Sequence, residues 1–341
     1  ATLRSRHDAL FLGIGAGRGL TLGIPGEEGA GTWTGTDYLG RVNRGEPVSL
    51  GDRVVVVGGG NTAVDAARAA RRTGAEVTML YRRTRAEMPA IEAEVDDALA
   101  EGVQVEYLAG PVEIIREGDA LRAVLVRRME LGAPDSSGRR KPVPIPGSEY
   151  QLPATAVIAA VSQTPEWPGM DTLADGKVWA TDAELEDGLW TGGDTLGLGI
   201  ASRAIAQGRQ AAEAVHAHLQ GLEPPATPAR APLPQRGVKP DFYPGQAPVS
   251  LPHRPADHWK VDPEGELQDT ISQELFLEEI GRCFSCGLCY GCEQCFMYCN
   301  VGGFTRLDQV APGAYFTFDS DLCQACGKCA DLCPCGFLTP N

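Results

Sequence analysis

Cysteine is the residue whose placement in this chain most directly indicates chemistry. All eleven cysteines of the 341 residues lie between Cys283 and Cys335. Two runs share the spacing C-x2-C-x2-C-x3-C, one starting at Cys289 and the other at Cys323. Thiols crowded in this way form either a metal centre or a disulfide knot. The first residues show no basic segment followed by an apolar one, so we expect no signal peptide and a reducing, cytoplasmic setting.

The spacing of the two runs decides between these alternatives. Zinc ribbons use C-x2-C pairs, whereas two C-x2-C-x2-C-x3-C runs are typical of bacterial-type ferredoxins with two [4Fe–4S] clusters. In those proteins the fourth cysteine of each run ligates the other cluster. The ligand sets predicted on that rule are Cys289, Cys292, Cys295 and Cys333 for one cluster, and Cys323, Cys326, Cys329 and Cys299 for the other.

Three cysteines remain outside these sets: Cys283, Cys286 and Cys335. Cys283 and Cys286 continue the three-residue spacing, so a register that uses Cys286 is an open alternative. The x3 step occurs in this region only before Cys299, which favours the register given above. We expect the three remaining thiols to pack in the fold or to lie beside the clusters.

A glycine-rich turn between two apolar runs is the second feature that indicates chemistry. Val54 to Val57 predicts a buried strand, a helix is expected from about Thr62 to Thr73, and Val77 to Tyr81 predicts a second strand. The G-x-G-x-x-A turn between them consists of Gly58, Gly59, Gly60, Asn61, Thr62 and Ala63. A unit of this kind binds a dinucleotide, with the pyrophosphate on free amides at the helix N-terminus.

The end of the second strand bears on the choice of nucleotide. NAD-selective sites place Asp or Glu there, whereas this chain has Arg82, Arg83 and Arg85. Arginines suit a 2′-phosphate, so we expect NADPH rather than NADH, with NADH as the alternative donor. A solvated basic loop would have the same sequence. An earlier glycine cluster, Gly13 to Gly17, is followed by too many helix breakers to form a second phosphate-binding turn.

A second glycine turn precedes an alanine-rich segment. A short strand is expected to end at Gly193 and Asp194, and a helix to run from about Ile200 to Leu219. Asp194 could be a turn or cap residue, or it could accept a hydrogen bond from the ribitol chain of a flavin. The local pattern leaves both interpretations open.

Residues 8–219 resemble the small subunit of glutamate synthase and related NAD(P)H oxidoreductases. The similar stretches are GGGNTAVDAAR, YRRTRAEMPA, RRMELGAPDSSGRRKPVPIPGSE and TGGD. The resemblance implies a nucleotide-binding domain inserted into an FAD-binding domain, with Ser162 standing where the family usually has Gly. It also implies FAD contacts at Gly193, Asp194 and the helix start at Ile200 and Ala201, with Gln163 at the crossing between the domains.

The resemblance also implies a part that these residues do not contain. The family's flavin domain begins with its own G-x-G-x-x-G unit, upstream of the segment that resembles residues 8–12. We therefore expect a preceding segment or a second chain to supply the missing half of the FAD site. Small subunits of this kind with an appended C-terminal ferredoxin, such as the DsrL proteins of sulfur metabolism, have the same order of parts.

Together these features predict an α/β fold: a Rossmann-type domain inserted in a partial FAD-binding domain, followed by a small α+β ferredoxin domain. Between them, ten prolines in residues 221–255 indicate a semi-rigid linker. The expected boundaries are 1–45 and 161–220 for the FAD-binding parts, 46–160 for the nucleotide domain, 221–272 for the linker and 273–341 for the ferredoxin domain.

Composition and charge limit the partners. A net charge of −15 argues against nucleic acid, and no apolar run is long enough to span a membrane. Because the first 282 residues lack cysteine, a redox dithiol beside the flavin is excluded within them. We expect electrons to pass from NADPH through FAD and two clusters to a redox partner protein of the glutamate synthase, sulfite reductase or ferredoxin type.

Alternatives to this activity are a flavin reductase of the pyrimidine dehydrogenase type and a non-catalytic electron-relay or structural subunit. No catalytic acid or base is predicted, because hydride transfer to a flavin depends mainly on alignment.

Overall fold

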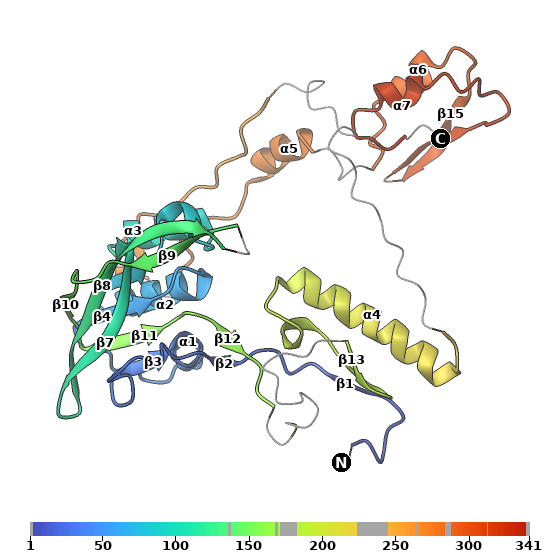
Figure 1. The fold of residues 1–341 in the computed structure, drawn as a ribbon. Coiled ribbons are helices and arrows are strands. Elements are labelled where there is room, and N and C mark those ends of the chain that lie inside the picture. Colours follow the sequence, from blue (N-terminus) through green and yellow to red (C-terminus); the bar gives the residue numbers. More distant parts are fainter. Residues whose placement is uncertain are drawn as a thin grey trace. The chain divides into compact units, whose positions relative to one another are not determined.

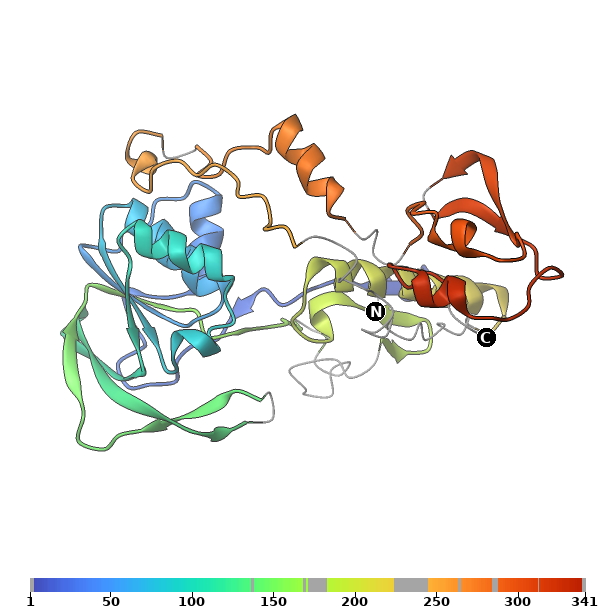
Figure 2. The same ribbon diagram turned by 90° about the horizontal axis from the view of Figure 1, so that it is seen from above.

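The computed structural model describes residues 3–135, 138–167, 170, 183–223, 245–262, 265–283, 288–311 and 313–338. The chain folds into two compact units. The first consists of Ala1–Thr227 and Pro255–Gly265, and the second of Pro228–Arg254 and Glu266–Asn341. Figure 1 shows the elements in the colours of the sequence, and Figure 2 shows them from above.

A five-stranded parallel sheet forms the centre of the first unit. Its strands, in spatial order, are β3 (Thr32–Thr34), β11 (Ala156–Ala159), β4 (Arg53–Val57), β5 (Glu76–Tyr81) and β6 (Gln104–Tyr107). Its helices are α1 (Gly35–Asn43), α2 (Asn61–Arg72) and α3 (Glu92–Ala100). The four valines of β4 are all buried, as a β-branched run in the middle of a parallel sheet should be.

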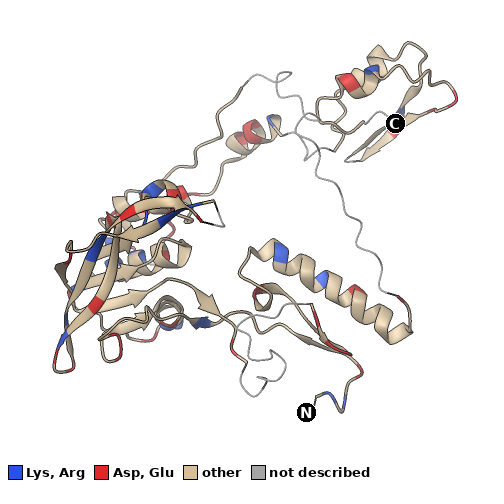
Figure 3. Ribbon diagram, in the orientation of Figure 1, with Lys and Arg blue, Asp and Glu red and all other residues tan. Residues whose placement is uncertain are grey.

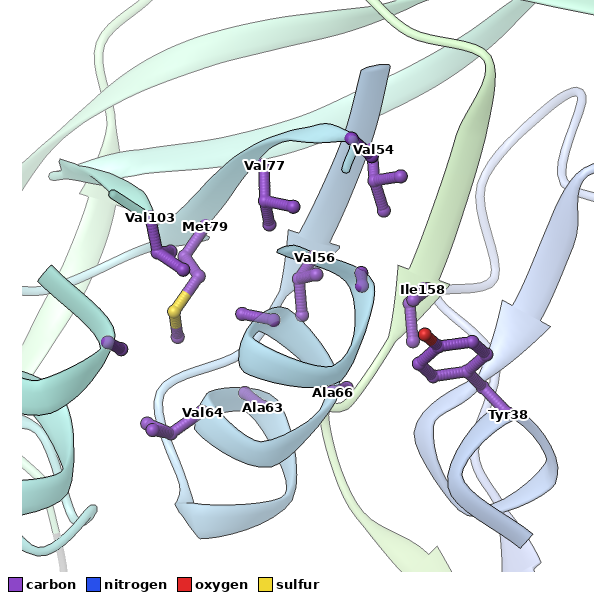
Figure 4. Packing of buried hydrophobic residues seen from close by; sticks show 14 of the residues in the cluster. Tyr38, Val54, Val56, Ala63, Val64, Ala66, Val77, Met79, Val103 and Ile158 are labelled. Atoms are coloured by element: carbon purple, nitrogen blue, oxygen red, sulfur yellow. The ribbon is translucent and has the colours of Figure 1, made fainter. Parts of the chain in front are cut away.

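Successive valines of β4 face opposite sides of this sheet. Val54 and Val56 pack toward α2, together with Val77 and Met79 of β5 (Figure 4). The facing side of α2 consists largely of alanine, at Ala63, Ala66, Ala67 and Ala70, all fully buried. Small side chains let the helix approach the sheet closely, so the glycine turn that joins β4 to α2 is held in a fixed position.

The other side of the sheet is covered by antiparallel strands, which form a layer without helices. These strands are β7 (Ala109–Glu117), β8 (Ala120–Pro134), β9 (Arg140–Pro144) and β10 (Tyr150–Pro153). Val55 and Val57 of β4 pack there with Val124 and Val126 of β8. The expected alternation of strands and helices therefore describes one face of the sheet, and a strand layer covers the other.

A smaller part of the first unit carries the second glycine turn. It contains β1 (Leu10–Leu12), β13 (Glu184–Glu186) and β14 (Leu189–Thr191), and α4 (Ala201–Gln220) packs on β14. Two short strands, β2 (Arg18–Gly19) and β12 (Gln163–Thr164), pair antiparallel where the chain leaves and re-enters this part. No helix follows β1 before α1, as predicted for the cluster at Gly13–Gly17. None of the described helices is long and apolar enough to cross a membrane.

Part of the segment predicted as a linker packs on the first unit. Trp259, in the short helix η5 (His258–Lys260), is 8% exposed, and the guanidinium of Arg71 lies 5.9 Å from its ring centroid. Residues 255–265 therefore belong to the first unit. Residues 224–244 of the predicted linker lie outside the described residues, and the proline content gave no sign that an aromatic anchor follows them.

In the part of the second unit that the structure describes, three helices and one hairpin are present, and two of the helices lie at the cysteine runs. Its elements are α5 (Gln273–Gly281), α6 (Gln294–Tyr298), β15 (Phe304–Ala311), β16 (Ala314–Phe318) and α7 (Lys328–Leu332). β15 and β16 pair antiparallel, and α6 contacts α7. Each cysteine run thus ends in a short helix, and the two helices pack together.

Candidate functional site

The three glycines of the first turn are each required for a different structural reason. Gly58 has φ +152°, and a Cβ there would lie 2.3 Å from the carbonyl oxygen of Ala160 and 3.0 Å from the Cβ of Ala63. At Gly59 a Cβ would lie 2.4 Å from the ring of Tyr81. At Gly60 a Cβ would meet nothing within 4 Å. At the first two positions, neighbouring protein atoms leave no room for a side chain. At Gly60 the space is open, so a ligand can approach the backbone there.

The N-terminus of α2 has the character of an anion site. Gly60 is the N-cap residue and has no side chain to cap the helix, and the first turn contains no acidic residue. The amides of Ala63 and Val64 bond to the carbonyl of Gly60, at 2.9 and 3.2 Å. The amides at the very start of a helix have no carbonyl acceptor within that helix, and the helix dipole favours negative charge at this end. The turn can therefore hold a pyrophosphate.

The segment after β5 is fastened to this turn. Tyr81 donates its hydroxyl to the carbonyl of Glu87 at 2.7 Å, and Thr84 forms a capping box with Glu87. The amide of Ala90 donates to the carbonyl of Gly59 at 3.2 Å, and the amide of Ile91 to Oδ1 of Asn61 at 3.0 Å. Residues 81–91 thus fix the edge of the nucleotide site. The T-x-x-E pattern at Thr84 could have predicted the capping box, which sequence reasoning missed.

The three arginines predicted at the 2′-phosphate lie in three different environments. Arg82 is exposed. Arg85 forms an ion pair with Asp96 at 2.5 Å. Arg83 is 5% exposed, donates to Asp135 at 2.8 Å and to the carbonyl of Arg140 at 2.7 Å.

The geometry of Arg83 differs from the prediction. Its guanidinium is turned into the protein and binds the β8–β9 hairpin, 52 residues away in the sequence. A buried, paired guanidinium is not available to a phosphate, so Arg83 has a structural role here. Arg82 and Arg85 are the members of the group that are accessible to a nucleotide.

The second glycine turn is held by one hydrogen bond to α4 and one to the chain just before it. Gly193 donates its amide to Oε1 of Gln207 at 2.8 Å, and Oδ1 of Asp194 accepts the amide of Gly199 at 3.0 Å. Asp194 therefore acts as a turn residue through one oxygen, which leaves the other available. The helix start is open to solvent: Ile200 is 73% exposed and Ala201 is exposed.

Two threonines missed by sequence reasoning lie in the same part of the fold. Thr195 is fully buried and Thr164 is 1% exposed, and within the described residues neither hydroxyl has a hydrogen-bond partner. Gln163, beside Thr164, pairs with Gly19 in the β12–β2 link. A buried hydroxyl without a partner is costly, so these groups fit a site that is completed by polar atoms from elsewhere.

The first cysteine run borders a partly open cavity of about 130 Å³. Five cysteines line it: Cys289, Cys292, Cys295, Cys333 and Cys335. Most of the remaining lining is aromatic, from residues that include Phe304, Tyr315, Phe316, Phe318 and Phe337. Four of the five thiols are the set predicted for one cluster, with Cys333 contributed by the other run.

The two cysteine runs repeat one backbone conformation. Gly291 and Ala325, at matching positions, have φ of 76° and 51°, and Glu293 and Gly327 have φ of 66° and 75°. Left-handed residues at these positions turn the chain so that successive cysteines point inward. Neither Glu293 nor Ala325 adopts this conformation readily, so the repeated turn is maintained against its local preference.

The cysteines of the second predicted ligand set are more exposed than those of the first. Cys323 and Cys326 are exposed, and Cys329 and Cys299 are half-buried. The amide of Ala325 donates to the sulfur of Cys323, and that of Gly303 to the sulfur of Cys299, each at 3.3 Å. Hydrogen bonds from the backbone, first from Gly303, lower the pKa of Cys299, whereas burial raises the pKa of Cys295 to about 11.

These surroundings fit an iron–sulfur cluster better than a single metal ion. Among the described residues, no three His, Cys, Asp or Glu side chains are close enough to hold one ion. The thiols of the first run instead surround a space with an apolar lining. Amide donors to sulfur and a dry, shaped cavity are the surroundings that tune such clusters.

Two known protein families match parts of the chain. Residues 2–208 match the family described as pyridine nucleotide-disulphide oxidoreductase. The chain belongs to this family. Residues 316–339 match the 4Fe-4S binding domain family, and that range contains Cys323, Cys326, Cys329 and Cys333. The chain thus combines an FAD/NAD(P)-binding oxidoreductase fold with a 4Fe–4S binding domain. No cysteine occurs in residues 2–208.

Curated relatives of this oxidoreductase family cover part of the chain. The beta subunit of an NADP(+)-dependent formate dehydrogenase from Moorella thermoacetica is 40% identical over 238 residues, which cover 65% of this chain and 33% of the relative. The beta subunit of an NADPH-Fe(3+) oxidoreductase from Geobacter sulfurreducens is 45% identical over 169 residues, with coverages of 48% and 25%. The glutamate synthase [NADPH] small chain of Halomonas elongata is 37% identical over 241 residues, with coverages of 64% and 51%.

The chain therefore spans between a quarter and about half of the length of these relatives. Among solved structures, FprA from Mycobacterium tuberculosis in complex with NADPH superposes with a TM-score of 0.53 at 21% identity, covering 64% of this chain and 65% of that one. At this identity the similarity concerns the fold alone.

Proposed function

We propose that the chain is the electron-transfer part of an NADPH-dependent iron–sulfur flavoprotein similar to the glutamate synthase small chain. The observation that carries the proposal is that one chain combines a phosphate-binding turn, open at Gly60, with a thiol-lined cavity in its second unit. When bound, FAD would convert a two-electron hydride donor into single electrons, and two [4Fe–4S] clusters would conduct them to a partner protein.

NADPH is the proposed donor. Arg82 is exposed at the end of β5, and within the described residues it has neither an ion pair nor a hydrogen bond. Arg85 can exchange its exposed partner Asp96 for a phosphate. The names of all three relatives described above contain NADP or NADPH, which supports the same choice. NADH remains the alternative that the experiment compares.

The residues proposed to contact FAD form one side of a site. Gly193, Asp194, Thr195 and the start of α4 at Ile200 and Ala201 present a free carboxylate oxygen, a buried hydroxyl and open helix amides. Gln163 lies in the link between the two FAD-binding parts, which we propose to be 1–45 and 161–220. The remaining side would come from another segment of a longer protein or from a partner chain.

Each proposed ligand set combines the first three cysteines of one run with the fourth cysteine of the other. Cys289, Cys292, Cys295 and Cys333 would hold one cluster, and Cys323, Cys326, Cys329 and Cys299 the other. From Glu274 onward the chain has eight acidic and three basic residues, and Figure 3 shows acidic residues on α5. A partner with a basic face would be steered toward this segment. A reducing compartment such as the cytoplasm would keep the thiols available.

A visible spectrum of the longer protein or complex that contains this chain and completes the FAD site, purified without oxygen and loaded with FAD, tests this proposal. We expect iron and sulfide for two clusters and loss of visible absorption on addition of NADPH, faster than with NADH. Iron without any reduction by either nucleotide would favour the electron-relay subunit instead. Absence of iron and sulfide would contradict the proposal altogether.

One substitution isolates the nucleotide turn in that assay. Gly60→Asp adds a carboxylate where the pyrophosphate is expected, and Asp is a favourable N-cap residue, so α2 should remain stable. Reduction by NADPH should be lost while the iron content is unchanged. Gly118→Asp adds the same charge at the tip of the β7–β8 hairpin, where a Cβ meets nothing within 4 Å and the φ of +60° is one that Asp adopts more readily than most residues, and it should leave reduction unchanged.

A further inference from the structure

The cavity at the first cysteine run has one thiol more than a cluster needs. Cys335 lines it together with the four cysteines of the first proposed cluster. Both Cys335 and Cys333 are buried, at 2% and 7% exposure. Their sulfur atoms lie 3.7 Å apart. The spacing of the runs left Cys335 without a role, so its position in the cavity needs a separate explanation.

Two sulfurs at this distance cannot both be ligands of separate corners. Each iron of a [4Fe–4S] cluster already binds three sulfides and takes one thiolate, so a cluster with four cysteines has one for each corner. If a cluster is held by the first ligand set, Cys333 and Cys335 would compete for the same iron, because their sulfurs lie 3.7 Å apart. The one that does not bind must remain a thiol beside the bound sulfur.

The surroundings favour Cys333 as the ligand. Cys333 is the fourth cysteine of the second run, and in bacterial-type ferredoxins the fourth cysteine of one run ligates the cluster of the other run. The amide of Phe337 donates to the sulfur of Cys333 at 3.2 Å, a contact typical of a bound thiolate. The thiol of Cys335 then lies within hydrogen-bond reach of the sulfur of Cys333.

We propose that Cys335 is a non-ligating thiol that donates its S–H to the sulfur of Cys333 and thereby raises the reduction potential of the cluster at this cavity. A hydrogen bond to a ligand sulfur offsets negative charge, which favours the more negative, reduced state. With Phe337, the Cys333 sulfur would then receive two donors. This inference rests on the proposed function, because it assumes a cluster held by the first ligand set. Cys335 touches a ligand rather than the reacting atoms, so it is a positioning residue.

Redox titration of the chain, followed by electron paramagnetic resonance, tests the inference without any turnover. Cys335→Ala and Cys335→Val remove the donor, and Val also fills the buried space. Cys335→Ser keeps a donor. We expect the iron and sulfide content of all three to equal that of the parent chain. One of the two cluster potentials should shift to a more negative value in the Ala and Val variants and be restored in the Ser variant.

A matched control uses a cysteine away from the cavity. Cys283 is exposed and does not line the cavity, so Cys283→Ser should leave both potentials unchanged. Unshifted potentials in Cys335→Ala and Cys335→Val would overturn the inference. Loss of roughly half of the iron in these variants would overturn it as well, because Cys335 would then be a ligand. A parent chain without iron and sulfide would overturn the proposed function itself, a result distinguishable from either of these.

Discussion

The two units hold their shape by different means. In the first, buried apolar side chains fill both faces of the parallel sheet, and the nucleotide turn joins this core at Ala63 while its open position, Gly60, lies outside it. In the second, the described residues 288–338 contain few buried positions: Gly303, Phe304 and residues 333–336. Two of these six are cysteines that line the cavity.

The difference concerns where the binding groups lie relative to the core. In the first unit a ligand can leave without exposing apolar surface. In the second, the groups that would bind the clusters are also the interior. A domain this small seldom buries enough apolar surface to be stable alone, so metal binding becomes part of its folding free energy.

Removal of iron tests this contrast most strongly. An anaerobic chelator added to the iron-loaded chain should unfold the second unit around the cysteines and leave the parallel sheet folded, because the described residues of that unit bury few apolar side chains. Hydrogen exchange followed by mass spectrometry should show lost protection across β15, β16 and α7, with β4 and β5 unchanged. Protection that persists in the hairpin would show that Phe304 and its neighbours suffice without metal.

The reverse experiment truncates the core of the first unit. Met79→Ala removes a fully buried side chain between β5 and α2 and should lower the free energy of unfolding by about 2 to 5 kcal/mol, from lost burial and a residual cavity. Iron content should not change. Urea denaturation gives the first quantity and an iron assay the second. Val261→Ala, at a side chain that is 84% exposed, is the control and should cost less than about 0.5 kcal/mol.

Local patterns predicted the central elements of the first unit closely. The helix expected from about Thr62 to Thr73 is observed at Asn61–Arg72, and the strand expected at Val54–Val57 at Arg53–Val57. These elements are specified by residues next to one another in the sequence: a valine run, a glycine turn and a helix with one apolar face. The antiparallel layer on the other face was missed, because its partners are set by long-range pairing.

The same limit explains what sequence reasoning missed at the site. Arg83 follows a strand and looks like a phosphate ligand, but its partner Asp135 lies in a hairpin that local pattern could not place. Cys335 has no run of its own, and its proximity to Cys333 depends on how the chain turns after α7. Trp259 is an anchor inside a proline-rich segment. In each case the decisive contact is non-local or depends on backbone conformation.

Arg83 provides the next test, because it was predicted as a ligand and lies in the protein interior. Arg83→Ala leaves the carboxylate of Asp135, whose side chain is 19% exposed, without its guanidinium partner. We expect a loss of about 2 to 3 kcal/mol in the free energy of unfolding, below the cost for a fully buried pair. Thermal or urea denaturation measures it. Unchanged stability together with a large loss of NADPH affinity would show that Arg83 is a ligand after all.

Arg82 should show the smallest effect on the fold and the clearest effect on nucleotide choice. Its side chain is exposed, so Arg82→Ala should change the free energy of unfolding by less than about 0.5 kcal/mol. Loss of one charge-assisted contact to a 2′-phosphate should lower the preference for NADPH over NADH by roughly tenfold, which corresponds to about 1.4 kcal/mol. The two nucleotide affinities, measured by titration on Arg82→Ala and on the parent chain, give this ratio. Arg82→Lys keeps a charge and should retain part of the preference. An equal loss for both nucleotides would mean that Arg82 acts on the pyrophosphate or on the fold, and binding and core would then be less separate in the first unit than its structure indicates.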